Sequence, residues 1–89
     1  MLESDVEWTV VRRAEHKGWF TRKLRWIGRR HAPDHLFAKA GTLIFVEFKR
    51  PKNPSDRVMQ DREHERMREA GIEVRKVYTI EEGDALFGF

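Results

Sequence analysis

The spacing of apolar and polar residues predicts the element order α-β-β-β-α-β with a short terminal element, which places the chain in the α/β class. Over residues 3–17, apolar side chains from Val6 to Ala14 recur at helical spacing and predict an amphipathic helix. Ser4 and Glu7 fit a capping box at its start. Glu7 also borders the apolar stripe, so the spacing leaves open whether it caps the helix or points inward.

Three strands are predicted over residues 19–27, 35–39 and 43–50, and a turn joins the last two into an antiparallel hairpin. Alternate residues of a strand face opposite sides of a sheet. In the third strand both faces are apolar until Glu47 and Lys49, which share a face. A strand buried on both faces does not normally end in two charges unless something there uses them.

The second half of the chain predicts a helix, a strand and a short final turn or helix. A proline-rich break precedes the helix over 56–70, for which Ser55 or Asp56 is the expected N-cap. Its apolar stripe is thin and consists of Val58, Met59, Met67 and Ala70. The strand covers residues 72–80, and a capping box over 79–82 opens the final element.

The composition indicates one small domain over residues 1–89, with 39% hydrophobic and 37% charged residues and only a modest core. A core of this size makes a homodimer a reasonable expectation. The absence of cysteine excludes disulfides and thiolate zinc sites. No secretory pattern or apolar run of membrane-spanning length is visible, so we expect a cytoplasmic protein without a membrane partner.

A basic segment without any acidic residue runs from Lys17 to His31. Its cations are Lys17, Arg22, Lys23, Arg25, Arg29 and Arg30. Such side chains pair with phosphates, and interleaved aromatics can stack on bases. Because aromatic residues more often pack in a core, we expect structural roles for Trp19 and Trp26. The part from Arg22 to Arg30 supports one alternative function, a nucleic-acid-binding module without catalysis.

The acidic residues around the hairpin suggest a different chemistry. Asp34 precedes the hairpin and Glu47 lies near its end, so the two carboxylates could be neighbours across the ladder. Hard divalent cations prefer carboxylate and carbonyl oxygens, and the backbone carbonyl of Phe48 could add another. Lys49 would place an ammonium beside an attacking water or a scissile phosphate. Two carboxylates in one site repel each other, so one pKa should rise.

Two further interpretations compete with this metal site, besides the nucleic-acid-binding module. Glu47 and Lys49 could form an ordinary surface ion pair, and the chain would then be a small α/β interaction domain. The histidines offer a transition-metal site, since His31 and His35 flank Asp34. His64 lies far along the chain on the second helix, and no paired ligand spacing supports zinc.

The residues Pro33-Asp34 and Glu47-Phe48-Lys49 resemble the PD-(D/E)XK nuclease signature, and the wider pattern resembles its VRR-NUC branch, the virus-type replication-repair nuclease module. The resemblance extends over nearly the whole chain. It includes Glu3, Glu7, Gly18, Lys23, the loop Gly28-Arg29-Arg30, the strand ending in Val46–Pro51, Gln60 and Ala70-Gly71. It implies a restriction-endonuclease-like fold, with a mixed central sheet flanked by helices.

The resemblance also implies roles for individual residues. Asp34 and Glu47 would be ligands of Mg²⁺ or Mn²⁺, and Lys49 the catalytic lysine. A glutamate of the first helix would complete the site, with Glu7 the first choice and Glu3 the alternate. Gln60 would line the site, and the expected DNA contacts are Lys23, Arg29, Arg30 and His31. His31 departs from the family, which often has glycine at this position.

The function implied by the resemblance is a metal-dependent deoxyribonuclease that needs no small-molecule cofactor. Free-standing domains of this size resemble phage proteins that act as homodimers on branched DNA such as Holliday junctions. We therefore expect a phage- or bacterium-encoded endonuclease with DNA as its partner.

Overall fold

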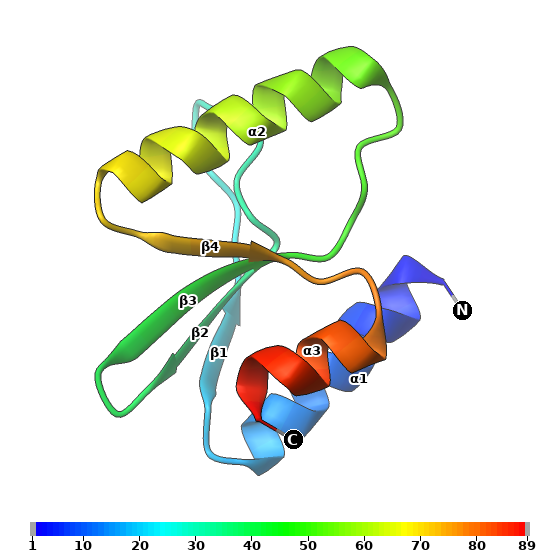
Figure 1. The fold of residues 1–89 in the computed structure, drawn as a ribbon, viewed down its shortest axis with the longest axis vertical. Coiled ribbons are helices and arrows are strands. Elements are labelled where there is room, and N and C mark those ends of the chain that lie inside the picture. The colour runs from blue at the N-terminus through cyan, green and yellow to red at the C-terminus, as the bar shows by residue number, and fades with distance from the viewer. Residues whose placement is uncertain (1, 89) are drawn as a thin grey trace.

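A computed structural model describes residues 2–88 and confirms the predicted α/β class and order of elements (Figure 1). The elements are α1 (Glu3–His16), β1 (Phe20–Lys23), β2 (His35–Lys39), β3 (Thr42–Glu47), α2 (Pro54–Glu69), β4 (Glu73–Lys76) and α3 (Ile80–Phe87). No helix within residues 2–88 combines the length and apolar character needed to cross a membrane.

The four strands form one mixed sheet in the order β1-β2-β3-β4. The first three strands are antiparallel neighbours, whereas β4 runs parallel to β3. A parallel pair requires a crossover, and α2 supplies it. Ala40 and Gly41 form the two-residue loop of the predicted hairpin, and both have the positive φ (49° and 85°) that such a turn requires.

Helices lie on both sides of this sheet. Figure 1 shows α1 and α3 together on one side, and α2 along β4 on the other. The main core lies between α1, α3 and the sheet and contains Val6, Val10, Ala14, Phe37, Ile44, Val46, Phe48 and Val77. α1 and α3 pack closely against each other. A Cβ atom added to Gly83 of α3 would lie only 2.6 Å from Cγ2 of Val10 in α1.

The prediction that β3 is buried on both faces is wrong for the first residues of this strand. Ile44 and Val46 point into the main core, but Leu43 is 48% exposed and Phe45 is only partly buried. The reason is that α2 packs against β4 and leaves much of its side of β1, β2 and β3 without a helix.

The predicted first strand, over residues 19–27, is also too long. β1 ends at Lys23, and residues 24–34 form a loop. The backbone N–H of Leu24 still donates to the carbonyl of Asp34 at 2.9 Å, after which the chain leaves the sheet. Gly28 and His31 follow the predicted strand, and their positive φ values (78° and 69°) belong to the loop.

Two helix starts differ from their predictions. α1 begins after Leu2 without a side-chain cap, so the predicted capping box of Ser4 and Glu7 is wrong. Asn53, rather than Ser55 or Asp56, caps α2, because its side chain accepts the N–H of Asp56 at 2.9 Å. Proline is well suited to the first helical position that follows.

The face that α2 turns to the sheet is mostly polar. Its buried residues are Gln60, Glu63, His64 and Met67, whereas Val58, Met59 and Ala70 of the predicted stripe are exposed. The predicted strand over 72–80 is shortened to β4, because Thr79 caps α3 by accepting the N–H of Glu82 at 3.0 Å. Thr79 is therefore confirmed as the N-cap of the second predicted capping box.

Candidate active site

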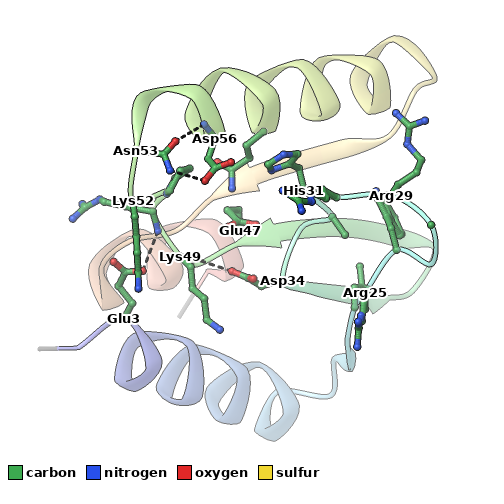
Figure 2. Close-up of a pocket in the computed structure, with 18 residues that line it drawn as sticks. Glu3, Arg25, Arg29, His31, Asp34, Glu47, Lys49, Lys52, Asn53 and Asp56 are labelled. Carbon is green, nitrogen blue, oxygen red and sulfur yellow. Dashed lines mark hydrogen bonds between the residues drawn. The ribbon is translucent and has the colours of Figure 1, made fainter.

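The structure brings Asp34 and Glu47 together at the end of the β2–β3 hairpin. His35 is paired with Val46, and continuing this register by one residue places Asp34 opposite Glu47. Oδ2 of Asp34 accepts the backbone N–H groups of Phe48 at 2.7 Å and Lys49 at 3.0 Å. Asp34 therefore ties the start of β2 to the segment that carries the other candidate residues (Figure 2).

Glu47 is a buried carboxylate with an unsatisfied oxygen. Its side chain is only 4% exposed, and Oε1 has no hydrogen-bond partner among the described residues. Burial, followed by repulsion from Asp34, raises the pKa of Glu47 to about 8, although the Gln60 side chain and the Asp34 backbone act in the opposite direction. A buried anion is costly without a partner, so this corner favours either a proton or a cation.

A divalent cation fits these two residues. Oδ1 of Asp34 receives no hydrogen bond from the residues that the structure describes, so each carboxylate keeps one oxygen for a ligand. The two side chains come from adjacent strands and repel each other electrostatically. Carboxylate oxygens of this kind are the usual ligands of Mg²⁺ and Mn²⁺.

Lys49 lies two residues beyond Glu47, just after β3, and is exposed on the same cavity. Figure 2 shows it between Asp34 and the segment that leads to Asn53. Its backbone is held by Asp34, while its side chain reaches away from that hydrogen bond. The structure thus groups Asp34, Glu47 and Lys49 at one place.

Glu7 points inward, but it is bonded elsewhere. It is 7% exposed, and Oε2 accepts Nζ of Lys23 at 3.0 Å and lies 3.2 Å from Nδ1 of His35. The hydrogen bond with His35, and then the contacts with Lys23, lower the pKa of Glu7 to about 2 against the opposing effect of burial. Lys23, expected to contact DNA, is thereby paired with a carboxylate.

His35 was not expected from sequence to contact Glu7. It is buried at the start of β2 and packs against Phe37 and Phe48. The signal that could have revealed this contact is strand alternation, since Lys23 is paired with His35 in the ladder and both face α1.

Glu3 lies in a different position from Glu7. It lines the cavity that contains Asp34, Glu47 and Lys49, and Oε2 accepts the backbone N–H of Arg50 at 3.0 Å. Within residues 2–88, no three histidines, aspartates or glutamates are grouped closely enough to hold a metal ion. The structure therefore brings together two carboxylates, those of Asp34 and Glu47. Neither glutamate of α1 joins them in a cluster of metal ligands, and neither do the three histidines considered for zinc.

The cavity has a volume of about 1000 Å³ and lies between two basic walls. One wall is the loop over 24–32, which contributes Arg25, Arg29, Arg30 and His31. The opposite wall is the segment over 49–53, which contributes Lys49, Arg50 and Lys52. Figure 2 shows Asp34 and Glu47 between these walls, and Gln60 of α2 lines the same cavity. This arrangement suits a polyanion that must approach two carboxylates.

Glu63 of α2 fixes the first of these walls. It is 9% exposed, accepts Nε1–H of Trp26 at 2.7 Å and pairs with Arg29 at 3.5 Å and Arg66 at 3.8 Å. Figure 2 shows Arg29 directed toward α2. Sequence reasoning missed this role, because a glutamate in a polar helix carries no local signal of burial. Trp26 is partly buried, and its N–H has a structural role.

His64, Gln60 and Glu47 leave buried polar atoms without partners. Both ring nitrogens of His64 and Oε1 of Gln60 lack a hydrogen bond among the described residues. Burial lowers the pKa of His64 to about 4, and the nearby cations Lys76 and Arg68 act in the same direction. His64 is therefore neutral near pH 7.

A comparison with solved structures finds a chain described as "VRR_NUC domain". It is 35% identical in sequence to this chain and superimposes with a TM-score of 0.81. The match covers 97% of this chain and 94% of the other. No family model and no curated protein sequence matches. The similarity thus extends over nearly the whole chain.

Proposed function

Because this chain belongs to the VRR-NUC family and is a nuclease-type domain, we propose that it is a metal-dependent endonuclease that hydrolyses phosphodiester bonds in branched DNA. The observation that carries this proposal is the pair Asp34 and Glu47. Glu47 has a buried oxygen without a partner and a pKa raised to about 8 beside a second carboxylate. Perturbed groups that line a cleft are typical of active sites.

Asp34, Glu47 and the backbone carbonyl of Phe48 are the groups that would hold Mg²⁺ or Mn²⁺. Such a cation supplies Lewis-acid stabilisation of phosphoryl oxygens and lowers the pKa of bound water. Of the two glutamates of α1, Glu3 lines the cavity, and we propose that it completes the site. Glu7, the first choice from sequence, instead holds Lys23 and His35.

Lys49 and the basic walls act on the substrate. The ammonium of Lys49 neutralises charge at the scissile phosphate, and Asp34 fixes the backbone from which it extends. Arg25, Arg29 and Arg30 receive backbone phosphates along one wall. Gln60 lines the site beside Glu47 and can hydrogen-bond a phosphate or a water there.

A homodimer suits a four-way junction, because paired incisions in a two-fold substrate need two related sites. The uncovered side of the sheet supports self-association. Phe20 and Leu43 are 50% and 48% exposed, and both are paired in the sheet with Ala38 between them. These two neighbouring apolar side chains would be buried if a second copy of the chain packed on this side of the sheet.

Cleavage assays test the proposal. Labelled duplex, flap and four-way-junction DNA would be incubated with Mg²⁺ or Mn²⁺ and the wild-type chain, Asp34→Asn or Lys49→Ala. We expect the wild type to cut the junction fastest, a chelator to stop it, and both variants to bind DNA without cutting. If all three proteins bind alike and none cuts with either metal, the chain is a DNA-binding module without catalysis.

A further inference from the structure

Ile27 is a fully exposed apolar residue in the basic loop over 24–32. Its exposed fraction is 99%, the highest among the large hydrophobic residues within 2–88. Arg25 precedes it by two residues, and Arg29 and Arg30 follow closely. An isolated exposed isoleucine is ordinary on a protein surface, but this one lies between arginines that line the active-site cavity.

The loop that carries Ile27 is held on both sides. Trp26, directly before it, donates to buried Glu63 at 2.7 Å. Arg29, two residues after it, pairs with the same carboxylate at 3.5 Å. Because both neighbours are tied to α2, the outward direction of Ile27 is set by the fold. Binding of a ligand to Ile27 would therefore cost little additional conformational entropy in this loop.

The chain neighbours of Ile27 line the active-site cavity. Residues 24–26 and 28–32 line this cavity together with Asp34 and Glu47, whereas Ile27 is not among the lining residues. It therefore stands outside the wall that its neighbours form. A DNA strand with a phosphate near Asp34 and Glu47 and further phosphates on Arg29 and Arg30 would pass close to Ile27, which directly precedes Gly28 of the same wall.

We propose that Ile27 is a wedge that enters a base step of bound DNA next to the cleavage site. This inference rests on the proposed function. Proteins that deform DNA commonly insert an isoleucine, leucine or phenylalanine between bases while nearby cations hold the phosphates. Unstacking costs less where bases are already unpaired. Ile27 would therefore give the enzyme its preference for branch points over continuous duplex.

Fluorescence of 2-aminopurine placed beside the branch point tests the wedge without requiring cleavage. The Lys49→Ala protein would be bound to this junction with Mg²⁺ and compared with variants that also carry Ile27→Ala or Ile27→Met. We expect unstacking to raise the fluorescence with Ile27 and with Met, and to leave it near the free-DNA level with Ala. Equal fluorescence for all three proteins overturns the wedge.

Cleavage kinetics give a second readout. With the wild-type lysine, Ile27→Ala should lower kcat/KM on the junction about tenfold, the effect expected for losing one buried aliphatic contact, and Ile27→Met should restore most of it. Val58→Ala, which truncates an exposed residue on α2, is the matched control and should change neither readout. A loss equal on linear duplex and junction overturns the branch preference.

Two results would distinguish a failure of the wedge proposal from a failure of the proposed nuclease function. If no protein cuts any DNA but the fluorescence still depends on Ile27, the wedge stands in a protein that is not a nuclease. Sedimentation velocity without DNA shows whether Ile27→Ala changes the oligomeric state. If it does, Ile27 belongs to a contact between copies of the chain, and the wedge is wrong.

Discussion

The carboxylate of Asp34 accepts the backbone N–H of Lys49 at 3.0 Å, so the candidate metal ligand and the candidate catalytic lysine are fixed relative to each other before any ligand binds. The neighbouring N–H of Phe48 donates to the same oxygen at 2.7 Å. Two hydrogen bonds to one carboxylate oxygen restrain the chain where β3 ends. This restraint holds backbone atoms and leaves the ammonium of Lys49 able to approach a phosphate.

Substituting Lys49 by alanine should therefore separate catalysis from stability. Lys49→Ala keeps both N–H donors to Asp34, so the free energy of unfolding should change by no more than ~0.5 kcal/mol. Loss of the ammonium should lower kcat at least ~100-fold, as expected when a charged group acts on the transition state. Lys52→Ala, on the same wall, should instead raise KM. A similar loss of kcat in both variants would contradict the role of Lys49.

The hairpin shows how much of the site could be predicted from the sequence. The predicted strands over 35–39 and 43–50 bring Asp34 near Glu47 but leave three residues for the turn. In the structure β3 begins at Thr42, and the register of this two-residue turn places Asp34 opposite Glu47. The family preference for glycine at position 31 also has a physical basis, since His31 has a φ of 69°. Local rules therefore predicted the hairpin and its neighbouring carboxylates, but not the exact turn or the start of α1 and α2.

The first wall of the cavity could not be predicted in this way. Residues 24–27 alternate as a strand would, but contacts with α2 hold them in a loop. Those contacts depend on Glu63, whose burial follows from the packing of α2 on β4 and from no pattern in its own helix. Likewise, Glu7 fits both a cap and an inward position, and only its contacts with Lys23 and His35 decide between them.

The stability of the metal-free protein should fall as the pH rises through the titration of Glu47. The pKa of this group is raised from 4.5 to about 8, so the folded state binds more protons than the unfolded state between these values. The free energy of unfolding attributable to Glu47 is therefore highest below pH 4.5 and is lost as the pH rises to about 8. Mg²⁺ or Mn²⁺ should restore stability at pH 8 by replacing the proton.

Glu47→Gln checks this linkage. The variant cannot ionise, so with a chelator at pH 8 it should unfold at a higher denaturant concentration than the wild type. It should gain little from added metal. Glu69→Gln, which changes an exposed glutamate of α2, serves as the control and should keep the wild-type dependence. Parallel curves of stability against pH for Glu47→Gln and the wild type would show that folding does not raise the pKa of Glu47.

The two glutamates of α1 should respond differently to substitution. Glu7→Gln removes a buried charge bonded to Lys23 and His35 and should lower the free energy of unfolding at neutral pH by ~2 kcal/mol. Since the pKa of Glu7 is lowered from 4.5 to about 2, its contribution is present above pH 4.5 and is lost as the pH falls toward 2.

Glu3→Gln should weaken Mn²⁺ binding and cleavage and leave stability nearly unchanged, because Glu3 is exposed on the cavity. Calorimetric titration with Mn²⁺ and denaturant unfolding of both variants measure the two effects. Weaker metal binding by Glu7→Gln alone, at conditions where that variant is fully folded, would assign the third ligand to Glu7.

The contact between Glu63 and Trp26 predicts an energetic coupling that a double-mutant cycle can measure. Trp26→Phe removes the indole N–H together with part of the ring, and Glu63→Gln removes the charge that accepts this N–H at 2.7 Å. The cycle separates the hydrogen bond from the lost ring contacts, because those are absent in both proteins that carry Trp26→Phe. A hydrogen bond to a buried carboxylate should give a coupling energy of ~2 kcal/mol in denaturant unfolding. Glu65→Gln is the control, because this exposed glutamate pairs with Arg68 on the same helix.

The same variants should also change DNA binding. Glu63→Gln releases Arg29 and Arg66 from their ion pairs, so the affinity for duplex DNA should rise and depend more steeply on salt. The rate of junction cleavage should nevertheless fall, because the wall that carries Arg29 and Arg30 is no longer fixed to α2. Tighter binding with slower turnover distinguishes a positioning role from general destabilisation, which would weaken both. Equal turnover by Glu63→Gln and Glu65→Gln would mean that the wall needs no such anchor.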